Sequence, residues 1–155
     1  HMVKLEGGRL MVEATQFLVG RGIPVCGHLG LTPQSVNSLG GYRVQGRSEE
    51  QAQQLVEDAI ALTAAGAGLL VLEAIPNAVT SRILQQIRIP TIGIGAGPEC
   101  SGQVLVLHDM LGITPGKKAR FVEDFMAVSS SIGGAIAAYV MAVKDGSYPA
   151  PRHCY

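Results

Sequence analysis

The chain has 155 residues, of which 47% are hydrophobic and 15% are charged, which is enough for one globular domain with a sizeable core. Its 12 lysines and arginines balance 12 aspartates and glutamates, so no basic field is present to bind a phosphate backbone, and we expect no nucleic-acid partner. Because no apolar run reaches the roughly 20 residues of a membrane span and no secretory signal opens the sequence, we expect a cytoplasmic protein without a membrane partner.

Four short apolar stretches are typical of buried parallel strands, because each is continuous rather than alternating and is bounded by glycine or proline. In chain order they are "MVKLEGG", "IPVCGHLG", "LLVLEAIP" and "IPTIGIGAG". A fifth stretch, "GQVLVLHDMLG", has similar content. We assign it as a strand, although its spacing would also suit a helix.

The clearest helix lies between the second and third strands. Ser48 and Gln51 have the spacing of a capping box, and Gly66 can close the other end. The apolar stripe of this helix consists of Ala52, Leu55, Val56, Ala59 and Leu62.

Weaker helical patterns cover residues 10–19 and 79–86, and each leads from one strand toward the next. This alternation predicts an α/β fold with a parallel sheet and right-handed crossovers. The stretch 118–144 is expected to form C-terminal helices in two pieces around the break at "SSSIGG".

Polar residues gather at the carboxyl ends of the predicted strands. Lys4 and Glu6 end the first strand, His28 ends the second and Glu73 ends the third. In parallel α/β folds, barrels above all, this end carries the active site, because the connecting loops converge there. Side chains alternate along a strand, so Lys4 and Glu6 should share a face with their charges adjacent, an arrangement that suits an anionic substrate held near a metal.

Each of these residues also has a structural interpretation. Lys4 and Glu6 can be a plain ion pair at a strand end, and a single histidine such as His28 is more often structural than catalytic. A charged carboxylate buried at Glu73 costs several kcal/mol, so it must be paired, protonated or in use. The convergence of all four residues at one end favours the functional interpretation.

The three cysteines, Cys26, Cys100 and Cys154, are odd in number and lack the paired spacing of metal ligands, so we interpret them as reduced thiols. Cys26 could be a nucleophile, because a histidine lies two residues on, but a small buried side chain is the interpretation that we favour. His108 and Asp109 would face opposite ways on a strand, which argues against a joint catalytic role.

Two connections could approach a ligand. In "GLTPQSVNSLGGYRVQGRS", Thr32 and Pro33 can start a short helix, and Arg43, Gln45 and Arg47 can reach an anion over the mouth of the site. The alternative is a solvated loop with ordinary surface arginines. The glycines of "GIGAGPECSG" match no complete phosphate-binding motif and are interpreted as a tight strand end.

The strand stretches, together with "GHLGLTPQSV" and "GGYRVQGR", resemble the 3-methyl-2-oxobutanoate (ketopantoate) hydroxymethyltransferase family over essentially the whole chain. The resemblance implies a (β/α)8 TIM barrel and an enzyme of pantothenate biosynthesis. Such an enzyme transfers a hydroxymethyl group from 5,10-methylenetetrahydrofolate to 3-methyl-2-oxobutanoate, with Mg2+ holding the oxo acid. It also implies a homo-oligomer.

Carried over position by position, the resemblance implies a role for each of the four residues. Lys4 and His28 are similar to substrate-binding residues, Glu6 to a metal ligand, and Glu73 to the proton acceptor. In such a reaction the enolate must be stabilised as it forms, and a metal and a lysine can supply the positive charge.

The chain departs from the family in length, since a complete barrel takes about 250 residues. Residues 1–155 resemble the last five strands and their helices. The preceding strands, which carry the family's metal-binding aspartates and a substrate-contacting serine, are missing. "HM" at the start fits either a cloning remnant or native sequence exposed by cleavage of a longer chain.

Three functions remain open on the sequence. The first is a catalytic portion of the hydroxymethyltransferase that needs the N-terminal half as its partner. The second is a non-catalytic folding or assembly fragment of that enzyme. The third is a metal-dependent 2-oxo acid lyase of the phosphoenolpyruvate mutase type.

Overall fold

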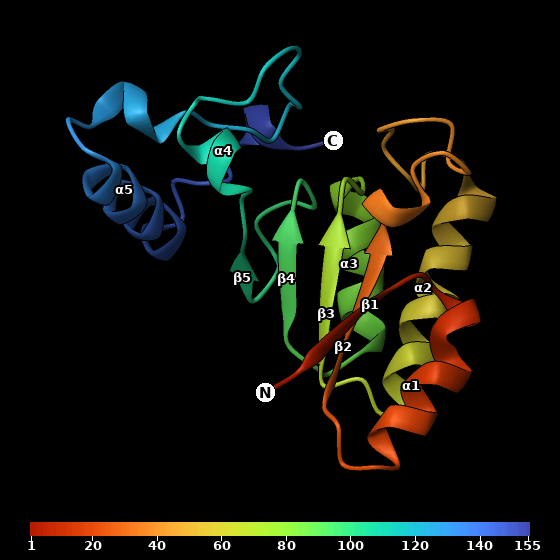
Figure 1. Cartoon of the computed structure of the whole chain (residues 1–155). Helices are drawn as coiled ribbons and strands as arrows, with labels where there is room; N and C mark the ends of the chain where they lie inside the picture. Colours follow the sequence, from red (N-terminus) through yellow and green to blue (C-terminus); the bar gives the residue numbers. More distant parts are fainter.

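A computed structural model describes residues 1–155 as an α/β protein with alternating strands and helices (Figure 1). The strands are β1 (Val3–Glu6), β2 (Val25–Gly30), β3 (Leu69–Glu73), β4 (Thr91–Ile94) and β5 (Gly102–Gln103). The α-helices are α1 (Val12–Val19), α2 (Glu49–Ala64), α3 (Asn77–Gln86), α4 (Leu107–Met110) and α5 (Ile132–Asp145). Short 3-10 turns are η1 (Arg9–Met11), η2 (Pro33–Ser35), η3 (Phe125–Val128) and η4 (Pro151–His153).

The five strands form one parallel sheet in the order β1-β2-β3-β4-β5, which confirms the predicted parallel α/β arrangement. The register pairs Glu6 with His28 and Gly30 with Glu73. The sheet is open, with β1 and β5 at its edges, so these residues do not close a barrel by themselves.

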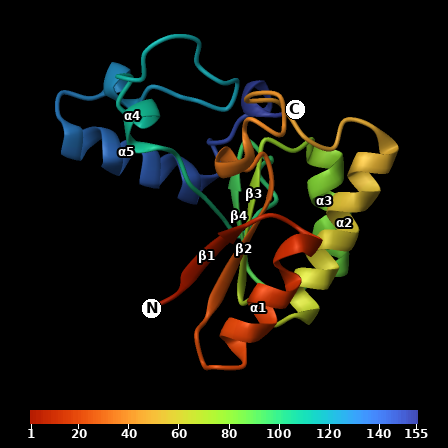
Figure 2. The same ribbon diagram turned by 45° about the vertical axis from the view of Figure 1, so that its right-hand side comes forward.

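One face of the sheet packs against α1, α2 and α3, which lie together on one side in both views (Figures 1 and 2). Leu29, Leu70 and Leu72 point to this face and are at most 2% exposed. Burial of each such side chain stabilises the fold by roughly 1.5–3 kcal/mol. Gly27 lies among them because a side chain there would collide with Leu62 and Leu70.

Helix α2 follows the predicted pattern at both ends. The Ser48 hydroxyl accepts a hydrogen bond from the Gln51 amide at 3.2 Å, as a capping residue does. The Gln51 side chain accepts from the Arg47 amide rather than from that of Ser48, so only half of the predicted capping box forms. Gly66 follows the helix with φ of +99°, a conformation that glycine adopts easily.

The predicted fifth strand is wrong over most of its length. Only Gly102–Gln103 pairs with β4, and Leu107–Met110 forms α4. The Val104 amide still donates to the Gly93 carbonyl at 2.9 Å, but β4 ends at Ile94, and α4 buries Met110 in a second apolar cluster instead of extending the strand. His108 and Asp109 therefore lie on a helix. Asp109 accepts a hydrogen bond from Thr114.

The second cluster lies in a separate lobe beyond β4 and β5, built around α4 and α5 (Figures 1 and 2). Phe125, Tyr139 and Tyr148 meet edge to face there, with ring centroids 5.4–5.8 Å apart. Of the two helical pieces expected in 118–144, the second is α5, and the first is only the short turn η3.

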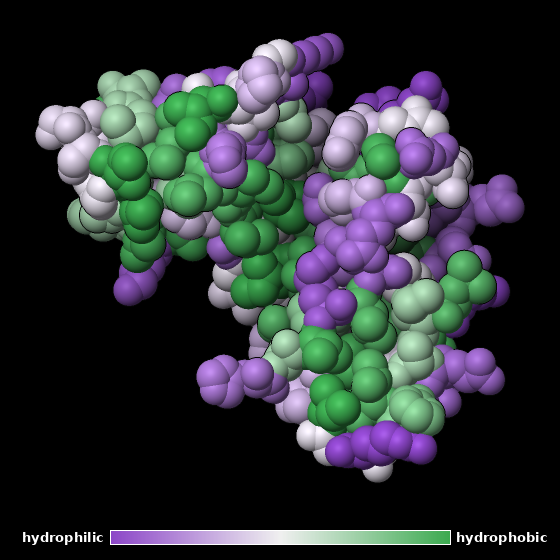
Figure 3. Space-filling view, in the orientation of Figure 1, coloured by the Kyte–Doolittle hydropathy of each residue, from purple (hydrophilic) through white to green (hydrophobic).

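Apolar side chains are exposed in two places. Figure 3 shows hydrophobic surface on the face that carries β1 and α1 and on the lobe of α5. Leu10, Phe17 and Val3 are exposed on the first, and Ile132 and Met141 on the second. No helix is both long and apolar enough to cross a bilayer.

Candidate active site

The four residues singled out at the strand ends lie on the face of the sheet opposite α2 and α3. Because side chains alternate along a strand, Lys4 and Glu6 share this face on β1, and His28 stands opposite Glu6 on β2. Glu73 ends β3 on the same face, two residues beyond Val71, which pairs with His28. Parallel pairing thus brings together residues that are up to 69 positions apart. The expected convergence at the carboxyl ends of the strands is observed.

Lys4 forms a close ion pair with Glu6, as their spacing predicted. Its Nζ lies 2.6 Å from Glu6 Oε1 and 3.2 Å from His28 Nδ1. The side chain of Lys4 is 44% exposed, whereas those of Glu6 and His28 are 7% and 4% exposed. The ammonium therefore lies at the open side of the site, where it can also contact an anion.

The contacts of His28 determine its tautomer. Lys4 has only donors, so His28 Nδ1 accepts its hydrogen bond and the proton of the neutral ring is on Nε2. Nε2 lies 3.2 Å from Glu73 Oε2. The two atoms are close enough for an electrostatic contact, but they are not aligned for a hydrogen bond. The ring thus places the protonated Nε2 beside the Glu73 carboxylate without donating a hydrogen bond to it.

Glu6 is held as a carboxylate. Its burial alone would raise its pKa, but the hydrogen bonds from Lys4 and from the Gln34 amide, with the charge of Lys4, lower it below the ordinary value. Gln34 lies in η2, the short helical turn predicted after Thr32. Its backbone N–H lies 3.0 Å from Glu6 Oε2, a contact between residues 28 positions apart that the sequence pattern does not reveal.

The backbone around Glu73 is tightly constrained. Ala74 has φ of +48°, is 3% exposed, and donates its N–H to Ile94 O at 2.9 Å. Its carbonyl accepts from the Gln45 amide at 2.9 Å. Gly30 lies against this turn. The position requires glycine, because a Cβ there would collide with the Glu73 carbonyl oxygen. Sequence reasoning missed the roles of Gly30 and Ala74, although the glycine that ends the predicted second strand was a usable signal.

A magnesium ion would find one suitable carboxylate here. Magnesium in enzymes commonly takes one or two carboxylates together with substrate oxygens and water, and Glu6 is such a carboxylate. No three histidine, cysteine or acidic side chains of this chain gather as a metal site. The fit is therefore partial, and further protein ligands would have to come from outside these residues.

Cys26 lies on the same face as Lys4 and Glu6 but has the environment of a buried thiol. It is 6% exposed, and its burial raises its pKa, which Lys4 and the Val71 backbone only partly offset. The protonated thiol donates weakly to the Gly27 carbonyl at 3.4 Å. The structure favours the non-nucleophilic interpretation of Cys26.

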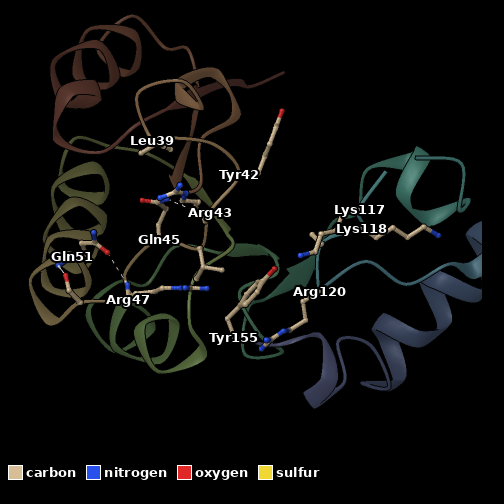
Figure 4. Close-up of a pocket in the computed structure, with 13 residues that line it drawn as sticks. Leu39, Tyr42, Arg43, Gln45, Arg47, Gln51, Lys117, Lys118, Arg120 and Tyr155 are labelled. Atoms are coloured by element: carbon tan, nitrogen blue, oxygen red, sulfur yellow. Dashed lines mark hydrogen bonds between the residues drawn. The ribbon is translucent and has the colours of Figure 1, made fainter. Parts of the chain in front are cut away.

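The connection from residue 39 to residue 51 forms one wall of an open cleft. Arg43, Gln45 and Arg47, which were expected to reach an anion, line this cleft (Figure 4). Lys117, Lys118, Arg120 and Tyr155 line the facing wall. Sequence reasoning missed this second wall, because residues 118–120 were assigned to a helix.

These features define a parallel α/β protein with a lysine, a histidine and two carboxylates at the carboxyl ends of adjacent strands. The profile of the ketopantoate hydroxymethyltransferase family matches residues 1–151. The chain belongs to the ketopantoate hydroxymethyltransferase family.

Named relatives agree with this membership. The chain is 66% identical over 155 residues to a 3-methyl-2-oxobutanoate hydroxymethyltransferase of Azoarcus sp. (strain BH72), covering 99% of this chain and 57% of the relative. It is 62% identical over 155 residues to the enzyme of that name from Aromatoleum aromaticum and 61% identical over 154 residues to that from Burkholderia multivorans, with the same shares covered. The chain thus spans little more than half the length of these relatives.

Proposed function

We propose that the chain supplies the base and part of the substrate site of an enzyme that transfers a hydroxymethyl group from 5,10-methylenetetrahydrofolate to 3-methyl-2-oxobutanoate, giving 2-dehydropantoate. The observation that carries this proposal is the convergence of Lys4, Glu6, His28 and Glu73 on one face. The names of the relatives, which state the oxo acid and the transferred group, support the same reaction.

Glu73 is the proposed base. The reaction requires removal of the proton on C3 of the oxo acid, next to the ketone. The Glu73 carboxylate is 13% exposed and makes only the unaligned contact with His28, so its oxygens are free to accept a proton. Its position just before the Ala74 turn keeps it at the end of β3.

Lys4 and His28 are the proposed substrate-binding groups. The exposed ammonium of Lys4 can bind the carboxylate of the oxo acid or stabilise the oxyanion that develops as C3 loses its proton. The Nε2–H of His28, which has no hydrogen-bond partner, can donate to a substrate oxygen bound beside Glu73. A donor that contacts the ketone oxygen stabilises the enolate more than the ketone, because negative charge develops on that oxygen.

We propose Glu6 as one ligand of Mg2+. When bound, the ion would act as a Lewis acid on the oxygens of the oxo acid. Glu6 is suited to this role because its carboxylate stays ionised. Its present contacts with Lys4 and the Gln34 amide would have to be shared with the ion.

The remaining parts of the proposal concern the whole enzyme. The open edge of β1 and the length of the relatives support a (β/α)8 barrel in which this chain is the C-terminal part of one domain and the N-terminal half supplies the missing strands. The exposed apolar surface of α5 is compatible with a homo-oligomer. The free thiols of Cys26, Cys100 and Cys154 support a cytoplasmic location.

Loss of the C3 proton in heavy water tests this function. The chain would be incubated with 3-methyl-2-oxobutanoate and Mg2+, with and without the N-terminal portion of the Azoarcus relative, and followed by NMR. We expect exchange only when both parts are present. Absence of exchange in every mixture would contradict the proposal and favour an assembly fragment.

A further inference from the structure

The charged side chains that line the cleft between residues 39–51 and residues 117–120 are all positive. Its volume is about 1190 Å³, and its lining includes five cationic side chains and no acidic one. The cations are Arg43, Arg47, Lys117, Lys118 and Arg120. The chain as a whole has no net charge, yet five of its 12 lysines and arginines line this one cleft. A cleft lined by one sign of charge attracts ligands of the other sign.

Four of these five cations form no ion pair within the chain. Only Lys118 has a carboxylate partner, Asp124, at 3.6 Å. Arg120 donates to the Cys154 carbonyl and lies 5.2 Å from the centroid of the Tyr155 ring, so its guanidinium is held in place without being neutralised. Figure 4 shows these side chains extending from both walls, with Tyr155 standing between them. The arrangement therefore holds positive charge that lacks an internal counterion.

Both walls are fastened to the backbone that follows Glu73. From one wall, the Gln45 amide donates to the carbonyl of Ala74, the residue next to Glu73. From the other, the Tyr155 carbonyl accepts from the amide of Asn77 at 3.1 Å. The cleft thus opens beside the strand end that carries the proposed base. A ligand whose reactive part reached Glu73 could extend its other end into the cleft.

The lining also contains aromatic surface. Tyr42 is 77% exposed at the rim, and Tyr155 lies inside the cleft. Aromatic faces beside guanidinium and ammonium groups suit a ligand that joins an aromatic ring to carboxylates. The carboxylate of a small oxo acid already has a partner in Lys4, so the cleft is available for a larger anion.

We propose that this cleft binds the p-aminobenzoyl-glutamate portion of the folate cosubstrate, with Arg43, Arg47 and Lys117 contacting the glutamate carboxylates. The identity of this ligand rests on the proposed function, whereas the anion site itself rests on the cleft. Folates carry one or more glutamates, so a longer tail should make more contacts with the five cations.

The test is a binding titration of the full chain with p-aminobenzoyl-triglutamate, p-aminobenzoyl-glutamate and inorganic phosphate. We expect the triglutamate to bind more tightly than the monoglutamate and phosphate to bind weakly. The double variant Arg43→Gln/Arg47→Gln should weaken triglutamate binding about tenfold, and Lys117→Gln by a smaller factor. Added salt should weaken it as well.

The matched control is Arg88→Gln, because Arg88 is an exposed cation outside the cleft. It should leave triglutamate binding unchanged. Circular dichroism of each variant shows whether the fold is kept. Binding that is equal in the double variant and the parent chain, or phosphate binding as tight as that of the triglutamate, would overturn the proposal.

The two proposals fail separately. If the triglutamate binds through Arg43 and Arg47 but the C3 proton never exchanges in any mixture, the anion site stands and the proposed reaction is wrong. If the proton exchanges and the Arg43→Gln/Arg47→Gln variant binds the triglutamate as tightly as the parent chain, the reaction stands and the cleft assignment is wrong.

Discussion

Nε2 of His28 lies 3.2 Å from Oε2 of Glu73, and the ring that carries it is almost fully buried between Glu73 and the Lys4–Glu6 pair. This contact joins β2 to β3, and the contact of Lys4 with Nδ1 adds β1. Because Lys4 donates to Nδ1, the nitrogen that lies beside Glu73 is the one that carries the proton of the neutral ring. Glu73 thus has the protonated nitrogen of His28 beside it, while its carboxylate oxygens accept no hydrogen bond.

Protonation of Glu6 should destabilise the folded chain at low pH. Its pKa is lowered on folding from the ordinary value of 4.5, so its ionised form stabilises the fold fully above about pH 4.5. This contribution is lost as the pH falls through the folded-state pKa. Urea denaturation between pH 3 and pH 7 should show that Glu6→Gln is less stable than the parent at neutral pH. The difference should shrink in acid, and a difference that is constant over this range would contradict the assignment.

The two tyrosines of the second apolar cluster form a matched pair. The Tyr148 hydroxyl donates to the Phe121 carbonyl at 2.6 Å, whereas the buried Tyr139 hydroxyl has no hydrogen-bond partner. Tyr148→Phe should therefore cost about 1 to 2 kcal/mol in the free energy of unfolding, and Tyr139→Phe should be neutral or slightly stabilising. Equal losses in urea denaturation would show that the hydrogen bond to Phe121 does not contribute.

Burial raises the pKa of Tyr139 to about 12, so its hydroxyl stays neutral up to strongly alkaline pH. The comparison of the two phenylalanine variants is therefore made near pH 7, where both tyrosines are neutral.

The positive φ of Ala74 predicts sharp selectivity at that position. A β-branched side chain is strained in this conformation, so Ala74→Val should destabilise the chain by of order 1–3 kcal/mol. Ala74→Gly is the control, since glycine adopts a positive φ without a steric cost, and it should retain the stability of the parent. Thermal denaturation of both variants checks this. If valine is tolerated as well as glycine, the turn after Glu73 is less constrained than described.

The exposed edge of β1 should make the isolated chain self-associate. Val3 is 39% exposed and Met2 is 43% exposed beside a strand that has a neighbour on one side only. We expect species larger than a monomer in sedimentation velocity, and Val3→Lys should reduce them. A compact monomer for the parent chain at all concentrations would count against this prediction.

The convergence of Lys4, Glu6, His28 and Glu73 could be predicted from the sequence because two simple rules placed them together. Side-chain alternation put Lys4 and Glu6 on one face, and parallel pairing brought the carboxyl ends of three strands together. Neither rule specifies contacts between side chains. The choice of His28 Nδ1 as the acceptor and the hydrogen bond from the Gln34 amide to Glu6 depend on packing across the sheet.

The errors have equally local causes. The stretch from Gly102 to Gly112 has apolar residues that suit either a strand or a helix, and the outcome depends on tertiary structure, since β4 ends at Ile94 and Met110 packs into the second apolar cluster. The second wall of the basic cleft was missed because residues 117–120 reach it only through the fold of the C-terminal lobe. The positive φ of Ala74 has no signal in the residue type, since alanine rarely adopts it.

The most direct test of the account is the exchange of the C3 proton of 3-methyl-2-oxobutanoate by the Glu73→Gln variant, in heavy water with Mg2+ and the N-terminal portion of the Azoarcus relative. Glu50→Gln is the matched control, because Glu50 is an exposed glutamate on α2, away from the site. We predict that Glu73→Gln lowers the exchange rate at least a hundredfold, as expected for loss of a general base, while Glu50→Gln retains the parent rate. Exchange at the parent rate in Glu73→Gln would contradict the assignment of Glu73 as the base.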